Sequence, residues 1–104
     1  MTREYDKLVR DAIPAIIEDD GEQPVVHTVT GAEYERRLDE KLAEEVAEYR
    51  DSRDVEELAD ILEVVHAIRE QHGVSVEELQ ELRERKADER GRFDDGIVLE
   101  RVVE

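Results

Sequence analysis

The chain has 104 residues, and its 31 Asp and Glu side chains against 15 Lys and Arg give a formal net charge of −16. Binding to duplex nucleic acid or to an anionic membrane needs clustered Lys and Arg, so these two functions are disfavoured. There is no cysteine, which excludes disulfide frameworks and thiolate metal sites. No apolar stretch approaches the ~20 residues that a membrane span needs. We expect one cytoplasmic domain spanning residues 1–104, since no apolar signal segment opens the chain.

The basic residues are mostly arginine, with only three lysines in the chain. An acid-rich, lysine-poor surface suits a high-salt cytoplasm, because carboxylates keep a protein soluble while salt screens their repulsion. We therefore expect a halophilic source. Most carboxylates should then be solvated, so a motif made of carboxylates needs support from its position on a helix.

Start and stop signals in the first half of the chain predict a short helix, a strand and a long helix. The short helix covers about 12–19, capped at its start by Asp11. Residues 25–29 are rich in β-branched side chains and predict a strand. Thr30 and Glu33 have the spacing of a capping box, which opens a helix running to about residue 50.

The second half of the chain predicts two more helices and a final strand. The third helix runs from about residue 55 to Gly73, and the fourth covers 76–90 behind a capping box at Ser75. Residues 97–103 again favour a strand. We expect a mainly α fold of three main helices and one short one, with a two-stranded β ribbon formed by 25–29 and 97–103.

Apolar residues occupy a wide arc of the third helix, which indicates burial on more than one side, as at a dimer seam. A homodimer at least is therefore expected. On a helical wheel at about 100° per residue, Glu57 lies inside this arc, between Val64 and Ile68. Asp60 lies on the rim of the same arc.

On the second helix, Glu45 lies beside the apolar stripe and Glu48 lies one turn further on. Two such pairs on facing helices bring four carboxylates together, which is costly unless their charge is compensated. Arg or Lys partners would compensate it, and so would a divalent cation. Carboxylate oxygens suit Mg²⁺ or Mn²⁺.

The order of these acidic residues resembles a known family. Glu44-Glu45-Val46-Ala47-Glu48 followed by Glu57-Leu58-Ala59-Asp60 reads as E-E-x-x-E and E-x-x-D. With the flanking segments 5–14 and 86–93, this set is similar to the MazG-like, all-α nucleoside triphosphate pyrophosphohydrolase superfamily. The resemblance is strongest to a small stand-alone group described as phosphoribosyl-ATP pyrophosphohydrolase-like, and it spans most of the chain.

The resemblance implies a helical bundle completed as a dimer or a dimer of dimers. It also implies Mg²⁺-dependent cleavage of a nucleoside triphosphate, or of phosphoribosyl-ATP, to the monophosphate and pyrophosphate. The family's metal-ligand positions match Glu45, Glu48, Glu57 and Asp60, and Glu44 matches an accessory acidic position. Only eight residues separate Glu48 from Glu57, fewer than in larger members, which leaves the choice of substrate open.

The proposed chemistry also needs a group that orients the attacking water and cations that offset phosphate charge. Glu44 or Glu48 fits the first role. Lys86 and Arg90 lie four residues apart on one helix face and can reach one anion, and Lys7 and Arg10 are the other candidate phosphate ligands. The alternative is that these four cations form ion pairs with surface carboxylates and do not bind substrate.

Two other classes of function fit the same residues. A non-catalytic nucleotide-binding or regulatory module would bind nucleotide and Mg²⁺ without releasing pyrophosphate. A plain acidic helical dimerisation domain would use its carboxylates for solubility, and Mg²⁺ would not stabilise it beyond the effect of ionic strength. Phe93, just after the fourth helix, is expected to pack over the helix end.

Overall fold

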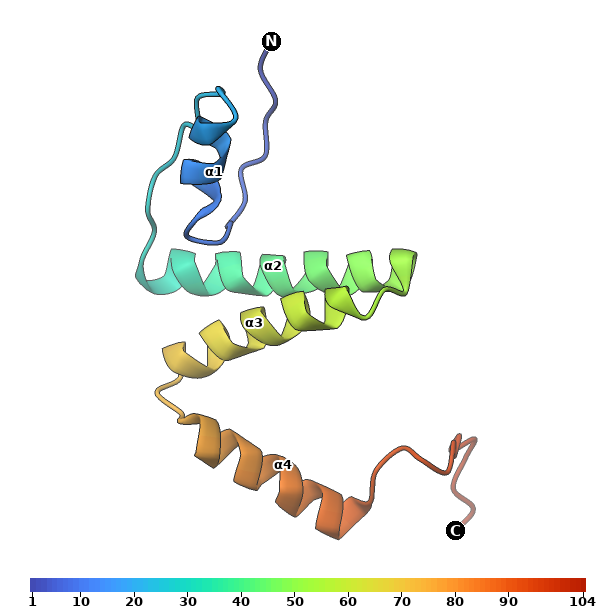
Figure 1. The fold of residues 1–104 in the computed structure, drawn as a ribbon. Helices are drawn as coiled ribbons and strands as arrows, with labels where there is room; N and C mark the ends of the chain where they lie inside the picture. Colours follow the sequence, from blue (N-terminus) through green and yellow to red (C-terminus); the bar gives the residue numbers. More distant parts are fainter.

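The computed structural model describes all residues 1–104 and is mainly α-helical, as predicted. Figure 1 shows the chain order of its four helices. They are α1 (Ile13–Asp19), α2 (Gly31–Ser52), α3 (Glu56–Gln71) and α4 (Val76–Arg90). No helix is both long and apolar enough to cross a lipid bilayer.

The two predicted capping boxes have different outcomes. At the start of α4, the Ser75 hydroxyl accepts a hydrogen bond from the Glu78 backbone N–H at 3.0 Å, and the Glu78 carboxylate accepts one from the Ser75 N–H at 3.3 Å. At the start of α2, the Thr30 side chain makes no capping bond, so that prediction is wrong. The Glu33 carboxylate lies instead 3.7 Å from the guanidinium of Arg37, one turn along the helix.

Helices α2 and α3 form an antiparallel pair joined by a short loop (Figure 1). Arg53 makes the turn out of α2 with a left-handed backbone, at φ 60°. The apolar core lies between these helices and is small, because only Leu38, Val64 and the carboxylate-bearing Glu45 are buried among 104 residues.

Helices α1 and α4 extend away from the α2–α3 pair, so the chain is elongated rather than compact. Helix α4 touches only α3 among the helices, and Figure 1 shows it diverging from α3. The radius of gyration is 18.4 Å, against about 13 Å for a compact domain of this length. Much apolar surface therefore remains uncovered in the single chain.

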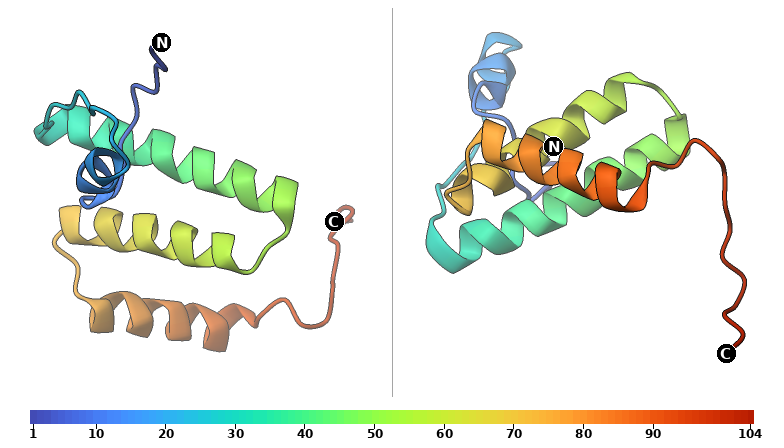
Figure 2. Two further views of the ribbon diagram at one scale, coloured as in Figure 1. Left: turned by 45° about the horizontal axis from the view of Figure 1, so that its top comes forward. Right: turned by 90° about the horizontal axis from the view of Figure 1, so that it is seen from below.

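The predicted β ribbon is absent, and this prediction is wrong. Residues 25–29 and 97–103 form no strand, and no backbone hydrogen bond joins them. Segment 25–29 precedes α2, whereas 97–103 trails away from the far end of α4 (Figures 1 and 2). Both runs are non-helical but do not pair, because the helices between them hold the two segments far apart (Figure 1).

Candidate metal centre

Three of the four predicted metal ligands meet between α2 and α3. Glu45, Glu57 and Asp60 each offer one carboxylate oxygen, and these oxygens lie within 4.8 Å of one another. Glu45 comes from the middle of α2, and the other two come from the first turns of α3. The i, i+3 spacing of Glu57 and Asp60 places both on the face of α3 that meets α2.

Glu45 is the buried member of this acidic cluster, with only 6% of its surface exposed. One of its oxygens, Oε1, lies 3.1 Å from the ammonium nitrogen of Lys41. The other, Oε2, is buried and has no hydrogen-bond partner. Because an unpartnered buried carboxylate oxygen is costly, this atom favours a nearby cation or proton donor.

The surroundings of Glu57 and Glu48 disfavour their charged forms. The pKa of Glu57 is raised first by loss of hydration and then by the negative charges of Asp60 and Glu45. The pKa of Glu48 is raised chiefly by the charge of Glu45, although the Glu48 side chain is exposed at the edge of the acidic cluster. Neither Glu48 nor Glu57 has an ion pair with a basic residue, so a cation placed here would relieve repulsion.

Glu44 lies in a different setting, although it is adjacent to Glu45 in sequence. Its carboxylate contacts the ammonium groups of Lys7 at 2.6 Å and Lys41 at 3.4 Å. Burial acts to raise the pKa of Glu44, but the hydrogen bond from Lys7 and the charges of both lysines outweigh it, so the pKa is lowered. Glu44 is therefore held as a charged partner of two lysines.

The N-terminal segment before α1 brings both of its predicted cations to the acidic cluster. Lys7 reaches Glu44, and the guanidinium of Arg10 lies 2.7 Å from Oδ1 of Asp60. In this structure both cations therefore bind protein carboxylates. Their location at the cluster is compatible with the predicted phosphate role and equally with the alternative of simple ion pairing.

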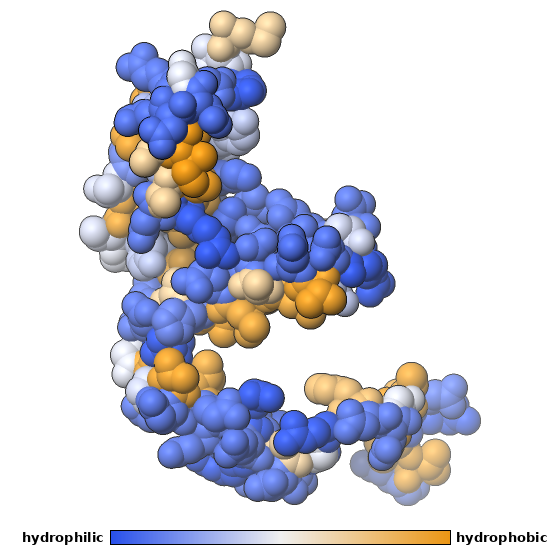
Figure 3. Space-filling model, viewed as in Figure 1, coloured by the Kyte–Doolittle hydropathy of each residue, from blue (hydrophilic) through white to orange (hydrophobic).

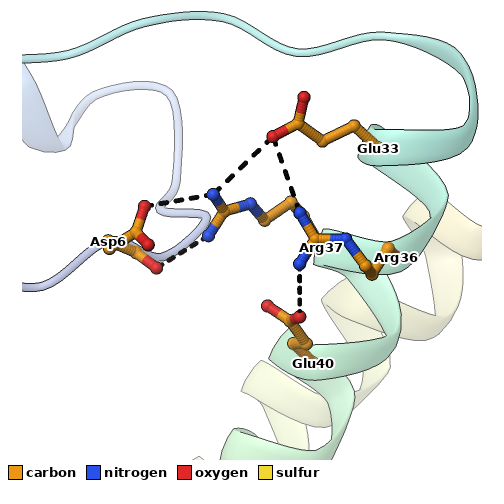
Figure 4. Close-up of polar contacts among 5 residues, drawn as sticks. All are labelled: Asp6, Glu33, Arg36, Arg37 and Glu40. Atoms are coloured by element: carbon orange, nitrogen blue, oxygen red, sulfur yellow. Dashed lines mark hydrogen bonds and ion pairs between the residues drawn. The ribbon is translucent and has the colours of Figure 1, made fainter.

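Arg37 of α2 fixes the path of this segment. Its guanidinium donates to the backbone carbonyl of Asp6 at 2.7 Å and to the Asp6 carboxylate at 3.0 Å (Figure 4). Asp6 has a left-handed backbone, at φ 43°, directly before Lys7. The turn held by Arg37 thus directs Lys7 and Arg10 back across α2 and α3.

The other two predicted phosphate ligands are not at the acidic cluster. Lys86 and Arg90 line a depression at the carboxyl end of α4, the helix that diverges from the α2–α3 pair (Figure 1). No carboxylate lies within ion-pair distance of either residue. The wheel placed them correctly on one face of their helix, but the structure does not bring that face to Glu45 or Glu57.

The sequence interpretation missed two residues that shape the site, Lys41 and Arg37. Lys41 precedes Glu45 by four residues, a spacing that brings side chains together on a helix and was a usable signal. The contact of Arg37 with Asp6 crosses 31 residues and left no comparable signal.

Comparison with known proteins assigns no family or activity to the chain. No family model and no solved structure matches it. An uncharacterized protein of Mycolicibacterium smegmatis is 52% identical over 50 residues, an alignment that covers 46% of this chain and 51% of the relative. The chain thus matches about half the length of this curated relative.

Proposed function

We propose that this chain is a Mg²⁺-dependent nucleotide pyrophosphohydrolase of the MazG-like type. It would cleave a nucleoside triphosphate, or phosphoribosyl-ATP, to the monophosphate and pyrophosphate. The observation that carries this proposal is the convergence of Glu45, Glu57 and Asp60 around the buried, unpartnered Oε2 of Glu45. The ordered acidic motifs of the sequence supply the reaction class.

The acidic cluster fits a small hard cation. Oxygens on opposite sides of a Mg²⁺ ion lie about 4.2 Å apart, twice the usual Mg–O distance. The three converging oxygens already lie within 4.8 Å of one another, so small side-chain rotations are enough to close the site. The same all-oxygen ligand set accepts Mn²⁺.

A bound divalent ion would supply charge neutralisation for the phosphate oxygens and a more acidic water. Among the protein's own groups, Glu48 is better placed than Glu44 to orient that water. Glu44 is engaged by two lysines, whereas Glu48 is exposed, has no basic partner and lies against Glu45. A carboxylate that keeps a free oxygen at the edge of the site can hold or accept a proton.

Lys7 and Arg10 would bind the phosphates of the nucleotide. Both lie at the acidic cluster on one segment, and their ion pairs with Glu44 and Asp60 are partly exposed to solvent. Exposed pairs of this kind contribute little stability, so exchanging a carboxylate for a phosphate partner costs little. The turn held by Arg37 keeps both cations near the site during that exchange.

We also propose that the chain acts as a homodimer, or as a dimer of dimers. Figure 3 shows apolar side chains gathered on the side of the α2–α3 pair that faces α4. Leu58 and Leu62 of α3 are 41% and 66% exposed, although both belong to the apolar arc of that helix. A second copy would cover this surface. Sedimentation that finds only monomer at micromolar concentration would contradict the dimer.

The test is pyrophosphate release with Mg²⁺ at high salt, measured across deoxynucleoside triphosphates, nucleoside triphosphates and phosphoribosyl-ATP. Wild type should release pyrophosphate from at least one substrate, and Glu57→Gln should lose that activity. Glu63→Gln is the matched control, because Glu63 lies on the same helix, is exposed and has no ion pair.

Two other outcomes would reject the hydrolase. Mg²⁺ and nucleotide binding without pyrophosphate release from any substrate would favour the nucleotide-binding module. Equal behaviour of wild type and Glu57→Gln, with no specific response to Mg²⁺, would favour the acidic dimerisation domain.

A further inference from the structure

Lys41 of α2 is the least exposed of the three cations that contact carboxylates at the acidic cluster. Its side chain is 15% exposed, against 39% for Lys7 and 54% for Arg10. Lys7 and Arg10 belong to the N-terminal segment, whereas Lys41 lies on the same helix as Glu45. The N-terminal segment can move away when a ligand binds, but Lys41 stays within reach of Glu45.

Lys41 bridges two neighbouring carboxylates. Its ammonium group donates to Oε2 of Glu44 at 3.4 Å and lies 3.1 Å from Oε1 of Glu45. A lysine placed four residues before a glutamate is the weaker of the two orders for stabilising a helix, because the opposite order suits the helix dipole. Helix stability therefore gives little reason for a largely buried lysine here, and the orientation of the Glu45 carboxylate gives a better one.

The contact with Lys41 separates the two oxygens of Glu45. Oε1 faces the ammonium group, whereas Oε2 is buried and has no hydrogen-bond partner. Glu57 and Asp60 each bring one carboxylate oxygen close to Glu45. Lys41 thus holds one oxygen of Glu45 and leaves a single oxygen for a cation at the acidic cluster.

The number of oxygens that a carboxylate offers affects which cation it suits. Ca²⁺ takes about six to eight oxygens in flexible geometry and accepts both oxygens of one carboxylate. Mg²⁺ is smaller and demands a nearly octahedral set of ligands, which the narrow angle between two oxygens of one carboxylate distorts. A glutamate that offers one oxygen therefore favours Mg²⁺ over Ca²⁺.

We propose that Lys41 is a positioning residue that makes the acidic cluster selective for Mg²⁺ over Ca²⁺. It acts through Glu45, by holding Oε1 so that only Oε2 is free for the cation. Without Lys41, both oxygens of Glu45 become free, which benefits Ca²⁺ and not Mg²⁺. The proposal rests on the proposed function for the presence of a divalent cation at these carboxylates, and it adds the group that selects the cation.

The test is calorimetric titration of the full chain with Mg²⁺ and with Ca²⁺ at fixed ionic strength. Lys41→Met should lower the ratio of Mg²⁺ affinity to Ca²⁺ affinity by about 10-fold or more, the usual effect of removing a group that orients a metal ligand. Loss of one positive charge acts alike on two ions of equal charge, so this ratio separates orientation from simple electrostatics. Lys41→Arg should keep most of the selectivity, because a guanidinium can also hold Oε1.

Arg50→Met is the matched control. It removes one positive charge from α2 at an exposed residue that has no ion pair, and the ratio of affinities should not change. Circular dichroism without metal checks that each variant is folded. Lys41→Gln, a second neutral variant, measures the same loss if Lys41→Met does not fold.

Three results would overturn the role of Lys41. They are an unchanged ratio in the neutral variant, an equal fall in Lys41→Arg, and a wild type that binds neither ion or prefers Ca²⁺. Pyrophosphate release in Mg²⁺ is measured separately. Release together with an unchanged ratio would reject only the role of Lys41, whereas a shifted ratio without release would reject only the hydrolase.

Discussion

Replacing Glu45 by Gln should abolish most of the stabilisation that Mg²⁺ gives to the folded chain. Glu45 provides one of the three converging oxygens and is the buried member of the acidic cluster. The substitution keeps the shape of the side chain and removes its charge. A ligand that binds only the folded state at ten times its Kd stabilises by about 1.4 kcal/mol. For a domain of this size that corresponds to a rise in Tm of about 6–11 °C.

Removing a group that supports a metal ligand usually lowers the metal affinity by about 10-fold or more. Because Glu45 is itself a proposed ligand, its loss should lower the affinity for Mg²⁺ at least as much. At the same Mg²⁺ concentration, the stabilisation of Glu45→Gln then falls to about 0.4 kcal/mol or less, a rise in Tm of no more than about 2–3 °C. Thermal melts followed by circular dichroism, with and without Mg²⁺, measure both values. Each Mg²⁺ sample is compared with a sodium sample of equal ionic strength.

Glu63→Gln is the control for removing one carboxylate from this acidic chain. It should keep the full Mg²⁺ response, because Glu63 is exposed on α3 and outside the acidic cluster. An equal rise in Tm for wild type and Glu45→Gln would refute binding at these residues. So would an equal rise for wild type in Mg²⁺ and in the sodium control.

Three further predictions follow from particular contacts. Because the folded-state pKa values of Glu48 and Glu57 lie above 4.5, the folded protein binds these protons more tightly than the unfolded chain. Urea unfolding without metal should therefore show wild type gaining stability as pH falls from neutral toward 4.5, relative to Glu48→Gln/Glu57→Gln; identical pH profiles would contradict this. Ser75→Ala should destabilise α4 by about 1 kcal/mol, seen as faster amide exchange in its first turn, whereas Thr30→Ala, which removes no capping bond, should not affect α2. Arg10→Gln frees Asp60 and should therefore tighten Mg²⁺ binding in a calorimetric titration; weaker binding would contradict the competition between Arg10 and the metal. The free energy of unfolding should change by less than about 1 kcal/mol, because the Arg10–Asp60 ion pair is partly exposed.

The helices were predictable because their signals are local. Glycines after α1, α3 and α4, apolar residues at helical spacing and the Ser75 capping box set bounds close to those observed. In the Thr30 capping box, the Glu33 carboxylate pairs with Arg36 and Arg37, and nothing in the sequence explains why the Thr30 hydroxyl makes no capping bond. The β ribbon failed because pairing 25–29 with 97–103 depends on how the intervening helices are placed, which no local pattern determines.

The acidic cluster was predictable for a similar reason. Glu57 lies among apolar residues on the wheel of α3, and Glu45 lies beside the apolar stripe of α2, so both point toward the contact between these helices. The ion pair of Lys7 with Glu44 joins residues 37 apart and that of Arg10 with Asp60 joins residues 50 apart, so only the structure reveals which carboxylate each cation meets.

The position of α4 was beyond the reach of a helical wheel. The wheel places Lys86 and Arg90 on one face of this helix, but it gives neither the angle between α3 and α4 nor the distance to the acidic cluster. The turn at Gly91 brings Arg92 and Phe93 beside Lys86 and Arg90, which the wheel of α4 does not show. Phe93, which the sequence predicts to pack over the helix end, is instead 97% exposed.

Anomalous diffraction from crystals grown with Mn²⁺ tests most directly whether Glu45, Glu57 and Asp60 hold a divalent cation. A manganese peak should appear within coordination distance of all three carboxylates, including Oε2 of Glu45, with Arg10 moved off Asp60. Manganese bound only at other carboxylates, with the Arg10–Asp60 ion pair unchanged, would contradict this binding.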